Sequence, residues 1–169
     1  MKRFLSFFLF GAVVLFSLLL LSCGRGGDYA DGIPCGELLE EAEEEVPVTF
    51  GYESLGREEI EFLFGGGLSA DDISLRYSKS SENINEIGIF HSPDKEAQKK
   101  TEEAVASYLA ERLADEAAFL ESYAPGELMK LQGARWRSFG SYTAYAVLEE
   151  KEAERFLEAV EKELLCEDR

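Results

Sequence analysis

The chain has 169 residues and a formal net charge of −17, with 34 acidic residues against 17 basic ones. This acidity argues against nucleic acid as a partner, because phosphate binding requires clustered lysine and arginine, and it disfavours close contact with anionic lipid headgroups. The length fits one domain with a hydrophobic core.

The N-terminus has the pattern of a lipoprotein signal peptide. Lys2 and Arg3 form a basic start, and residues 4–21 carry no charge, as in a secretory signal. The tetrapeptide Leu-Leu-Ser-Cys at 20–23 resembles the lipoprotein consensus, although its second leucine is bulky for that position. A cysteine placed there takes a diacylglycerol through a thioether, and two acyl chains give stable anchoring. We therefore predict that residues 1–22 are removed and that Cys23 is lipidated.

An uncleaved transmembrane anchor is the alternative interpretation, since the apolar run approaches the roughly 20 residues needed to span a bilayer. Lys2 and Arg3 would then keep the N-terminus cytoplasmic. Both interpretations place residues 24–169 on the extracytoplasmic side of the cell membrane. Removing the signal leaves 15 basic and 34 acidic residues, a net charge of −19, which favours solubility.

The predicted mature chain begins with a tether. Residues 24–34 are rich in glycine and lack periodicity, so we predict that 23–35 form the lipidated cysteine with a flexible tether and that 36–169 form a single domain. Eleven such residues span roughly 18 Å as a random coil. Cys35 and Cys166 lie near the two ends of this domain. They are either a disulfide, which an oxidising compartment allows, or two unrelated thiols.

Hydrophobic periodicity predicts the order helix, strand pair, long helix, strand pair, helix. In chain order the predicted elements are an acidic helix at 36–46, an extended piece at 46–52, a brief helix at 57–64, strands at 72–79 and 84–91, a long helix to about 123, a short helix before 133, strands at 134–139 and 141–148, and a helix at 150–165. Ser92 and Pro93 are the predicted N-cap and first residue of the long helix. Its apolar stripe includes Arg112.

This order indicates an α+β fold. We expect an antiparallel sheet of about four strands in two hairpins. The long central helix and the N- and C-terminal helices are expected to pack on one face of that sheet.

No catalytic or metal-binding motif stands out in the sequence. His91 is the only histidine, and no second histidine or cysteine cluster accompanies it to support a zinc site. The glycines at 65–67 follow a predicted helix and lack the Lys-Ser/Thr pair of a phosphate loop. We therefore predict a protein that is not an enzyme and has no catalytic residue, metal or cofactor.

Three arginines form the one candidate ligand site. Arg76, Arg135 and Arg137 each alternate with large apolar residues in predicted strands. Successive side chains on a strand point to opposite sides, so the three should share the face of the sheet that the helices leave exposed. Arginine suits bidentate contacts with carboxylate or phosphate. The alternative is cross-strand pairing with acids such as Glu86.

Several short stretches carry a family resemblance. They lie at residues 61–65, 71–72, 86–89, 123–125 and 140–142. Together they are similar to the clostridial lipoproteins classed as domain of unknown function 4358, over about residues 36–165. The resemblance implies an envelope lipoprotein and no activity.

The predicted function is that of a membrane-anchored extracytoplasmic lipoprotein whose domain is a non-catalytic binding or interaction module. An accessory subunit of a membrane transport or envelope-assembly complex is the alternative. The expected partners are the membrane, through the lipid on Cys23, and an unknown protein or envelope component.

Overall fold

The computed structural model describes residues 29–45, 52–80 and 83–165. The predicted signal peptide, Cys23 and Cys166 lie outside these ranges. In the described part of the chain, none of the helices combines the length and the apolar character needed to cross a membrane.

The centre of the domain is an antiparallel sheet of five strands. They are β1 (Tyr52–Ser54), β2 (Asp72–Ser78), β3 (Glu86–His91), β4 (Arg135–Phe139) and β5 (Tyr142–Val147), in the order β1-β2-β3-β5-β4. The α+β class is confirmed, with one strand more than predicted. The additional strand is β1, which is only three residues long and forms by pairing with the end of β2.

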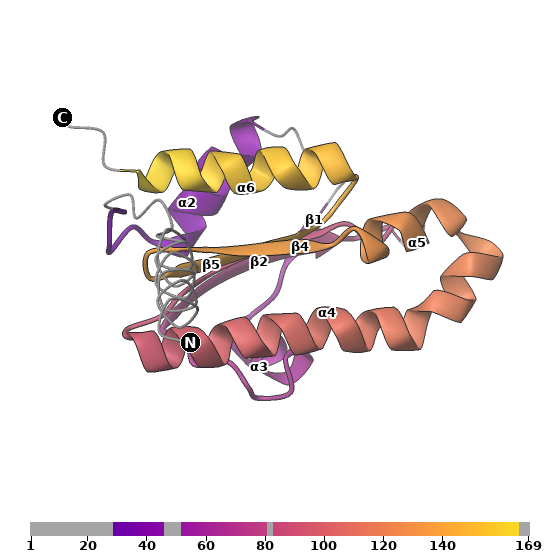
Figure 1. Ribbon diagram of the computed structural model, residues 1–169, viewed down its shortest axis with the longest axis horizontal. Coiled ribbons are helices and arrows are strands. Elements are labelled where there is room, and N and C mark those ends of the chain that lie inside the picture. Colours follow the sequence, from indigo (N-terminus) through magenta and orange to yellow (C-terminus); the bar gives the residue numbers. More distant parts are fainter. Residues whose placement is uncertain (1–28, 46–51, 81–82, 166–169) are drawn as a thin grey trace, which may run out of the picture.

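Helices cover both faces of the sheet (Figure 1). One face carries α2 (Cys35–Glu45) and α6 (Glu150–Leu164); the other carries α3 (Arg57–Leu63) and α4 (Lys95–Tyr123), and α5 (Pro125–Gln132) leads from α4 to β4. The prediction of helices on one face was wrong. The reason lies in the central strands, because β5 is buried at every position and β3 at all but its last. Strands buried on both faces do not show the alternation of a half-exposed sheet.

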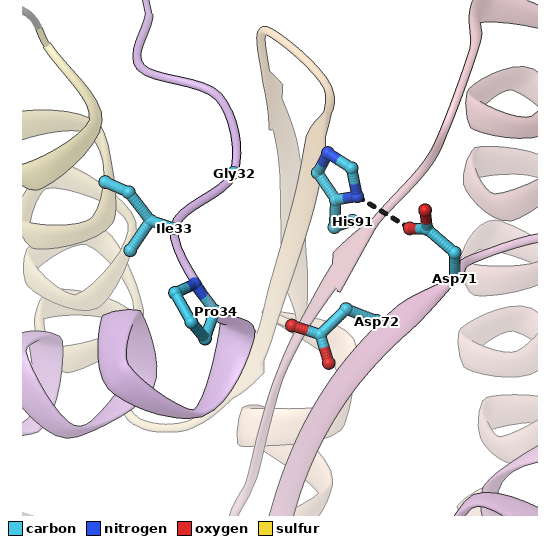
Figure 2. Close-up of a pocket in the computed structure, with 6 residues that line it drawn as sticks. All are labelled: Gly32, Ile33, Pro34, Asp71, Asp72 and His91. Carbon is cyan, nitrogen blue, oxygen red and sulfur yellow. Dashed lines mark hydrogen bonds and ion pairs between the residues drawn. The ribbon is translucent and has the colours of Figure 1, made fainter.

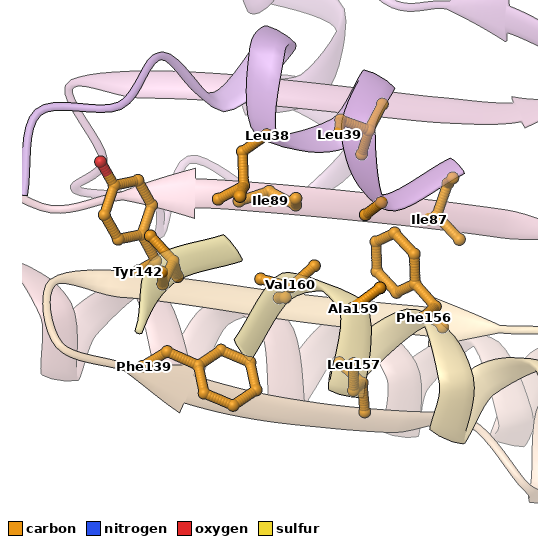
Figure 3. Close-up of a cluster of buried hydrophobic side chains, with 14 of the residues drawn as sticks. Leu38, Leu39, Ile87, Ile89, Phe139, Tyr142, Phe156, Leu157, Ala159 and Val160 are labelled. Atoms are coloured by element: carbon orange, nitrogen blue, oxygen red, sulfur yellow. The ribbon is translucent and has the colours of Figure 1, made fainter. Parts of the chain in front are cut away.

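The core on the α2–α6 face is mostly aliphatic (Figure 3). Leu38 and Leu39 of α2 and Phe156 of α6 meet Ile87 and Ile89 of β3 there. All five side chains are fully or almost fully buried. Burying each one contributes roughly 1.5–3 kcal/mol relative to exposure, and this core therefore fixes both helices on the sheet.

The core on the α3–α4 face is aromatic. The rings of Phe64 and Tyr145 contact each other and those of Phe90 and Tyr108, with centroids 4.4–6.2 Å apart. Gly88 of β3 lies directly under the Tyr145 ring, and a Cβ at Gly88 would come within 2.3 Å of that ring. A glycine is therefore required for the Tyr145 ring to lie flat against β3.

Helix α4 is the longest described element, with 29 residues and a length of about 44 Å. Its N-cap is Asp94, whose carboxylate accepts hydrogen bonds from the amides of Glu96 and Ala97. The predicted N-cap, Ser92, is instead buried, and its hydroxyl donates to Thr101. The C-terminal end of α4 runs past the sheet (Figure 1), and Leu120 is the only buried residue of the helix beyond Leu109.

The segment before α2 is part of the folded domain. The Ala30 amide donates to the Leu164 carbonyl at 2.7 Å, and Tyr29 pairs with Leu165 in an isolated β-bridge. The Tyr142 hydroxyl donates to the Ile33 carbonyl at 2.8 Å. The prediction of a flexible tether up to residue 35 was therefore wrong from Tyr29 onward, because these contacts depend on residues more than a hundred positions away.

Candidate functional site

A cavity of about 400 Å³ opens where β2 ends and β3 begins. This volume lies within the range of small-molecule sites. Apolar and aromatic side chains form most of its wall, and charged groups meet at its base. The lining residues of this Glu86 cavity are Leu55, Leu63, Tyr77, Glu86, Tyr108, Arg112 and Glu116.

Glu86 is the charged residue at the centre of the site. It is the first residue of β3 and only 5% exposed. The Tyr108 hydroxyl donates to its two carboxylate oxygens at 2.9 and 3.0 Å, and the Arg112 guanidinium donates at 2.6 Å. The Tyr145 hydroxyl of β5 donates as well. Helix α4 supplies two of these donors because residues four apart lie on one face of a helix.

Arg112 lies between two carboxylates. Its Nε donates to Glu116 at 2.8 Å, while Nη1 donates to Glu86. Glu116 follows Arg112 by four residues and is therefore on the same helix face. Its side chain is 35% exposed, against 6% for that of Glu86. The site thus has a buried acid at its base and a partly exposed acid at its mouth.

The electrostatics of the cavity favour a charged guanidinium on Arg112 and protonated hydroxyls on Tyr108 and Tyr145. The pKa of Glu86 is raised overall, because burial outweighs the charge of Arg112 and the tyrosine hydrogen bonds, which act to lower it. Burial and the nearby carboxylate raise the pKa values of Tyr108 and Tyr145, so both hydroxyls retain their protons. Burial acts to lower the pKa of Arg112, but Glu86 and Glu116 raise it overall.

The charged groups of the lining are engaged mainly with one another. Glu86 already accepts hydrogen bonds from three side chains, so it has little capacity to take a proton from a substrate. The lining contains no serine, cysteine, lysine or histidine that could act as a nucleophile. A mostly apolar cavity with a few convergent polar groups is the usual form of a small-molecule site.

A second polar cluster lies at the opposite end of β3 (Figure 2). His91 Nδ1 is 2.6 Å from Asp71, and Nε2 is 2.8 Å from Asp31. Asp31 also accepts a hydrogen bond from the Ser141 hydroxyl at 2.7 Å. The cluster borders a hollow of about 240 Å³ beside the segment that precedes α2. It therefore fastens the start of the domain to the sheet.

The His91 cluster does not have the geometry of a catalytic triad. The Ser141 hydroxyl donates to Asp31 and not to the imidazole, and both ring nitrogens are occupied by carboxylates. Neither nitrogen is therefore available to activate a nucleophile. Among the described residues, no group of three or more His, Cys, Asp or Glu side chains is arranged to hold a metal ion.

The pKa of His91 is expected to lie above its ordinary value of 6.5. Burial acts to lower it, but the hydrogen bonds and charges of Asp71 and Asp31 outweigh burial. A histidine with a raised folded-state pKa contributes stability that is complete below about pH 6.5 and is lost as the pH rises through the folded-state pKa. Because both carboxylates are largely exposed, we expect a contribution of only about 0.2–1 kcal/mol.

An NMR titration measures this pKa directly, since His91 is the only histidine in the sequence. The imidazole resonance should titrate above pH 6.5 in the unmodified protein. Its midpoint should fall in Asp71→Asn and in Asp31→Asn, while Asp115→Asn, a change in an exposed residue of α4, serves as the control. A midpoint at or below 6.5 in the unmodified protein contradicts the ion pairing of His91 with Asp71 and Asp31.

The three predicted arginines share one face of the sheet, but helices α2 and α6 pack on that face. Arg76 pairs with Glu40 and Glu43 of α2, and it is 12% exposed. Arg135 pairs with Glu150 and Arg137 with Glu154, both of α6.

Arg76 also lies far from the other two arginines. Arg76 and Arg135 occupy one row of the sheet, three strands apart, which is about 14 Å. The predicted helix-free surface with three converging arginines was therefore wrong, since helices pack on this face and supply an acidic partner for each guanidinium.

Cys35 is fully buried and forms no disulfide with another described residue. Its Sγ donates to the Asp72 carbonyl at 3.6 Å, and its amide donates to the Asp72 carboxylate at 2.7 Å. Burial raises the pKa of this thiol, which makes it unreactive. Cys166 lies outside the described residues, so the Cys35–Cys166 disulfide stays a prediction.

The Glu86 cavity was missed from sequence because its residues come from three separated segments. One signal was present, since Arg112 falls within the apolar stripe of α4 between Leu109 and Leu113. A charged residue on a buried helix face requires a partner. The partner, Glu86, is 26 residues away and is brought close only by packing α4 on the sheet.

Comparisons with known proteins identified no similar protein. No family model, no curated protein and no solved structure matches this chain. The resemblance to the clostridial lipoproteins therefore stays an expectation, and the functional argument depends on the geometry alone.

Proposed function

We propose that this chain is a lipid-anchored extracytoplasmic lipoprotein whose domain is a non-catalytic binding module, and that its ligand site is the Glu86 cavity. The observation that carries the binding function is a cavity of about 400 Å³ with a largely apolar wall and an ordered charged network at its base. The anchor follows from the signal-like N-terminus and Cys23.

The position of the cavity agrees with this proposal. The chain between Cys23 and Tyr29 reaches at most about 20 Å, so the end of the domain that holds Tyr29 lies near the membrane. His91 is at this end of β3, and Glu86 is at the other end, about 17 Å away. The cavity therefore opens at the end of the sheet that is farther from the lipid and accessible to ligands.

The cavity is tested by NMR titration with the neutral probe 1-hexanol. We expect it to shift amide resonances of lining residues such as Tyr77 and Glu116. Leu63→Trp adds bulk at the mouth of the cavity and should weaken 1-hexanol binding at least tenfold.

Phe62→Trp is the matched control, because Phe62 is the preceding residue of the same helix, is 88% exposed and does not line the cavity. It should bind 1-hexanol normally. The proposal fails if 1-hexanol causes no shift near the cavity, or if both tryptophan variants bind it equally.

An accessory subunit of a membrane complex is the second candidate, and one observation favours it. Phe119 and Tyr123 are 63% and 77% exposed on the part of α4 that extends past the sheet, with ring centroids 4.9 Å apart. Paired exposed aromatic residues are typical of protein interfaces. Loss of a crosslinked complex from intact cells in Phe119→Ser/Tyr123→Ser, with 1-hexanol binding unchanged, is the expected result for this candidate.

A further inference from the structure

We infer that the Glu86 cavity binds an organic cation, an ammonium or guanidinium head on an apolar body, with Glu116 as its counter-ion. This inference depends on the proposed function of the cavity and specifies the chemistry of its ligand. It follows from the hydrogen bonds and ion pairs that each charged side chain of the lining already makes.

Arg112 is not available to attract an anion. Each of its three guanidinium nitrogens already donates to a carboxylate, and Nη1 also donates to the Tyr108 hydroxyl. An anionic ligand would have to compete with Glu86 and Glu116 for Arg112. Displacing Glu86 would leave a buried carboxylate without its counter-charge, which is strongly unfavourable.

The Glu116 carboxylate can accept further hydrogen bonds, whereas that of Glu86 has little room for another. The described contacts of its carboxylate are those with Arg112, one at 2.8 Å and one at 3.5 Å, and a carboxylate can accept about four hydrogen bonds. Its partial exposure at the mouth lets a cationic head reach it without losing all of its hydration. A charge-assisted hydrogen bond to Glu116 is therefore open to a ligand.

The surrounding charges also favour a cation. The lining holds two carboxylates and one guanidinium. The wall residue Tyr77 donates to Glu53 at 2.8 Å, and the charges of Glu53 and Glu59 contribute to raising the pKa of Tyr77. Such a negative potential concentrates cations at the mouth of a cavity.

The wall specifies the rest of the ligand. Leu55 and Leu63 offer aliphatic surface, and the ring of Tyr77 offers aromatic surface. Aromatic faces attract ammonium and guanidinium groups through the ring quadrupole. A strongly hydrated inorganic cation gains nothing from such walls, whereas an alkyl or aryl ammonium buries its apolar part there.

Three probes of equal chain length test this inference: hexylammonium, hexanoate and 1-hexanol, titrated at pH 7 by NMR or calorimetry. We expect hexylammonium to bind about tenfold or more tightly than 1-hexanol, and hexanoate to bind more weakly than either. Glu116→Gln should weaken hexylammonium about tenfold and leave 1-hexanol within about twofold. It should also remove the discrimination against hexanoate, because Arg112 loses one of its two carboxylates.

Glu121→Gln is the matched control, since it makes the same change in net charge at an exposed position of the same helix. It should leave all three affinities within about twofold. Equal weakening of hexylammonium by Glu116→Gln and Glu121→Gln overturns the inference, because the attraction is then a property of the whole acidic surface.

The remaining outcomes separate this inference from the proposed function. If 1-hexanol enters the cavity and hexylammonium binds no more tightly than 1-hexanol, the cavity is a ligand site. The inferred preference for cations is then wrong. If none of the three probes reaches the cavity, the proposed function fails together with the inference.

Discussion

Replacing Arg112 with methionine is expected to lower the free energy of unfolding by about 3–5 kcal/mol at pH 7. Methionine keeps much of the apolar stem of the side chain but removes the charge that faces Glu86. The Glu86 carboxylate is buried, and in this variant it retains only the hydrogen bonds from Tyr108 and Tyr145. An uncompensated buried charge is among the largest single-residue costs in a folded protein. Chemical denaturation measures the loss.

The loss should depend on pH in a defined direction. Burial raises the pKa of Glu86, and Arg112 opposes that rise, so the variant should have an even higher Glu86 pKa. A carboxyl with a raised folded-state pKa contributes stability that is complete below the unfolded value of about 4.3 and is lost as the pH rises through the folded value. The difference between the two proteins should therefore be largest near neutral pH and shrink towards pH 4.

Two further variants control this prediction. Arg135→Met removes a half-exposed arginine that pairs with Glu150 and should cost no more than about 1 kcal/mol. Adding Glu86→Gln to Arg112→Met should recover part of the loss, because the buried charge itself is then absent. Equal destabilisation by Arg112→Met and Arg135→Met contradicts the role of the Glu86 network.

Replacing Cys23 with serine is expected to abolish lipid attachment completely. The hydroxyl cannot form the thioether, and the precursor should stay unprocessed at that site. Metabolic labelling with radioactive palmitate, followed by separation of membrane and soluble fractions, measures both effects.

Cys166→Ser is the matched control and should be labelled and processed normally. Should Cys23→Ser still take up fatty acid and be cleaved at the same position, the lipoprotein assignment is incorrect. The folded domain should be unaffected by Cys23→Ser, because its described contacts begin at Tyr29.

The sequence alone determined the elements whose signals are local. Alternation over residues 72–78 predicted β2, and the apolar spacing of the final helix predicted α6, because side-chain direction repeats every two residues in a strand and every 3.6 in a helix. The glycine at position 140 marked the turn between β4 and β5. It has φ +58° in the structure, a conformation that glycine adopts without a steric cost.

The tertiary structure decided whatever depends on partners distant in the sequence. The sequence showed that Arg76, Arg135 and Arg137 share one face of the sheet, because alternation is local. That α2 and α6 cover this face, with an acid opposite each arginine, depends on packing. The Glu86 cavity has the same origin, since a buried carboxylate and an arginine 26 residues away become partners only when α4 lies on the sheet. Desolvation of such pairs is a property of packing, and local periodicity does not report it.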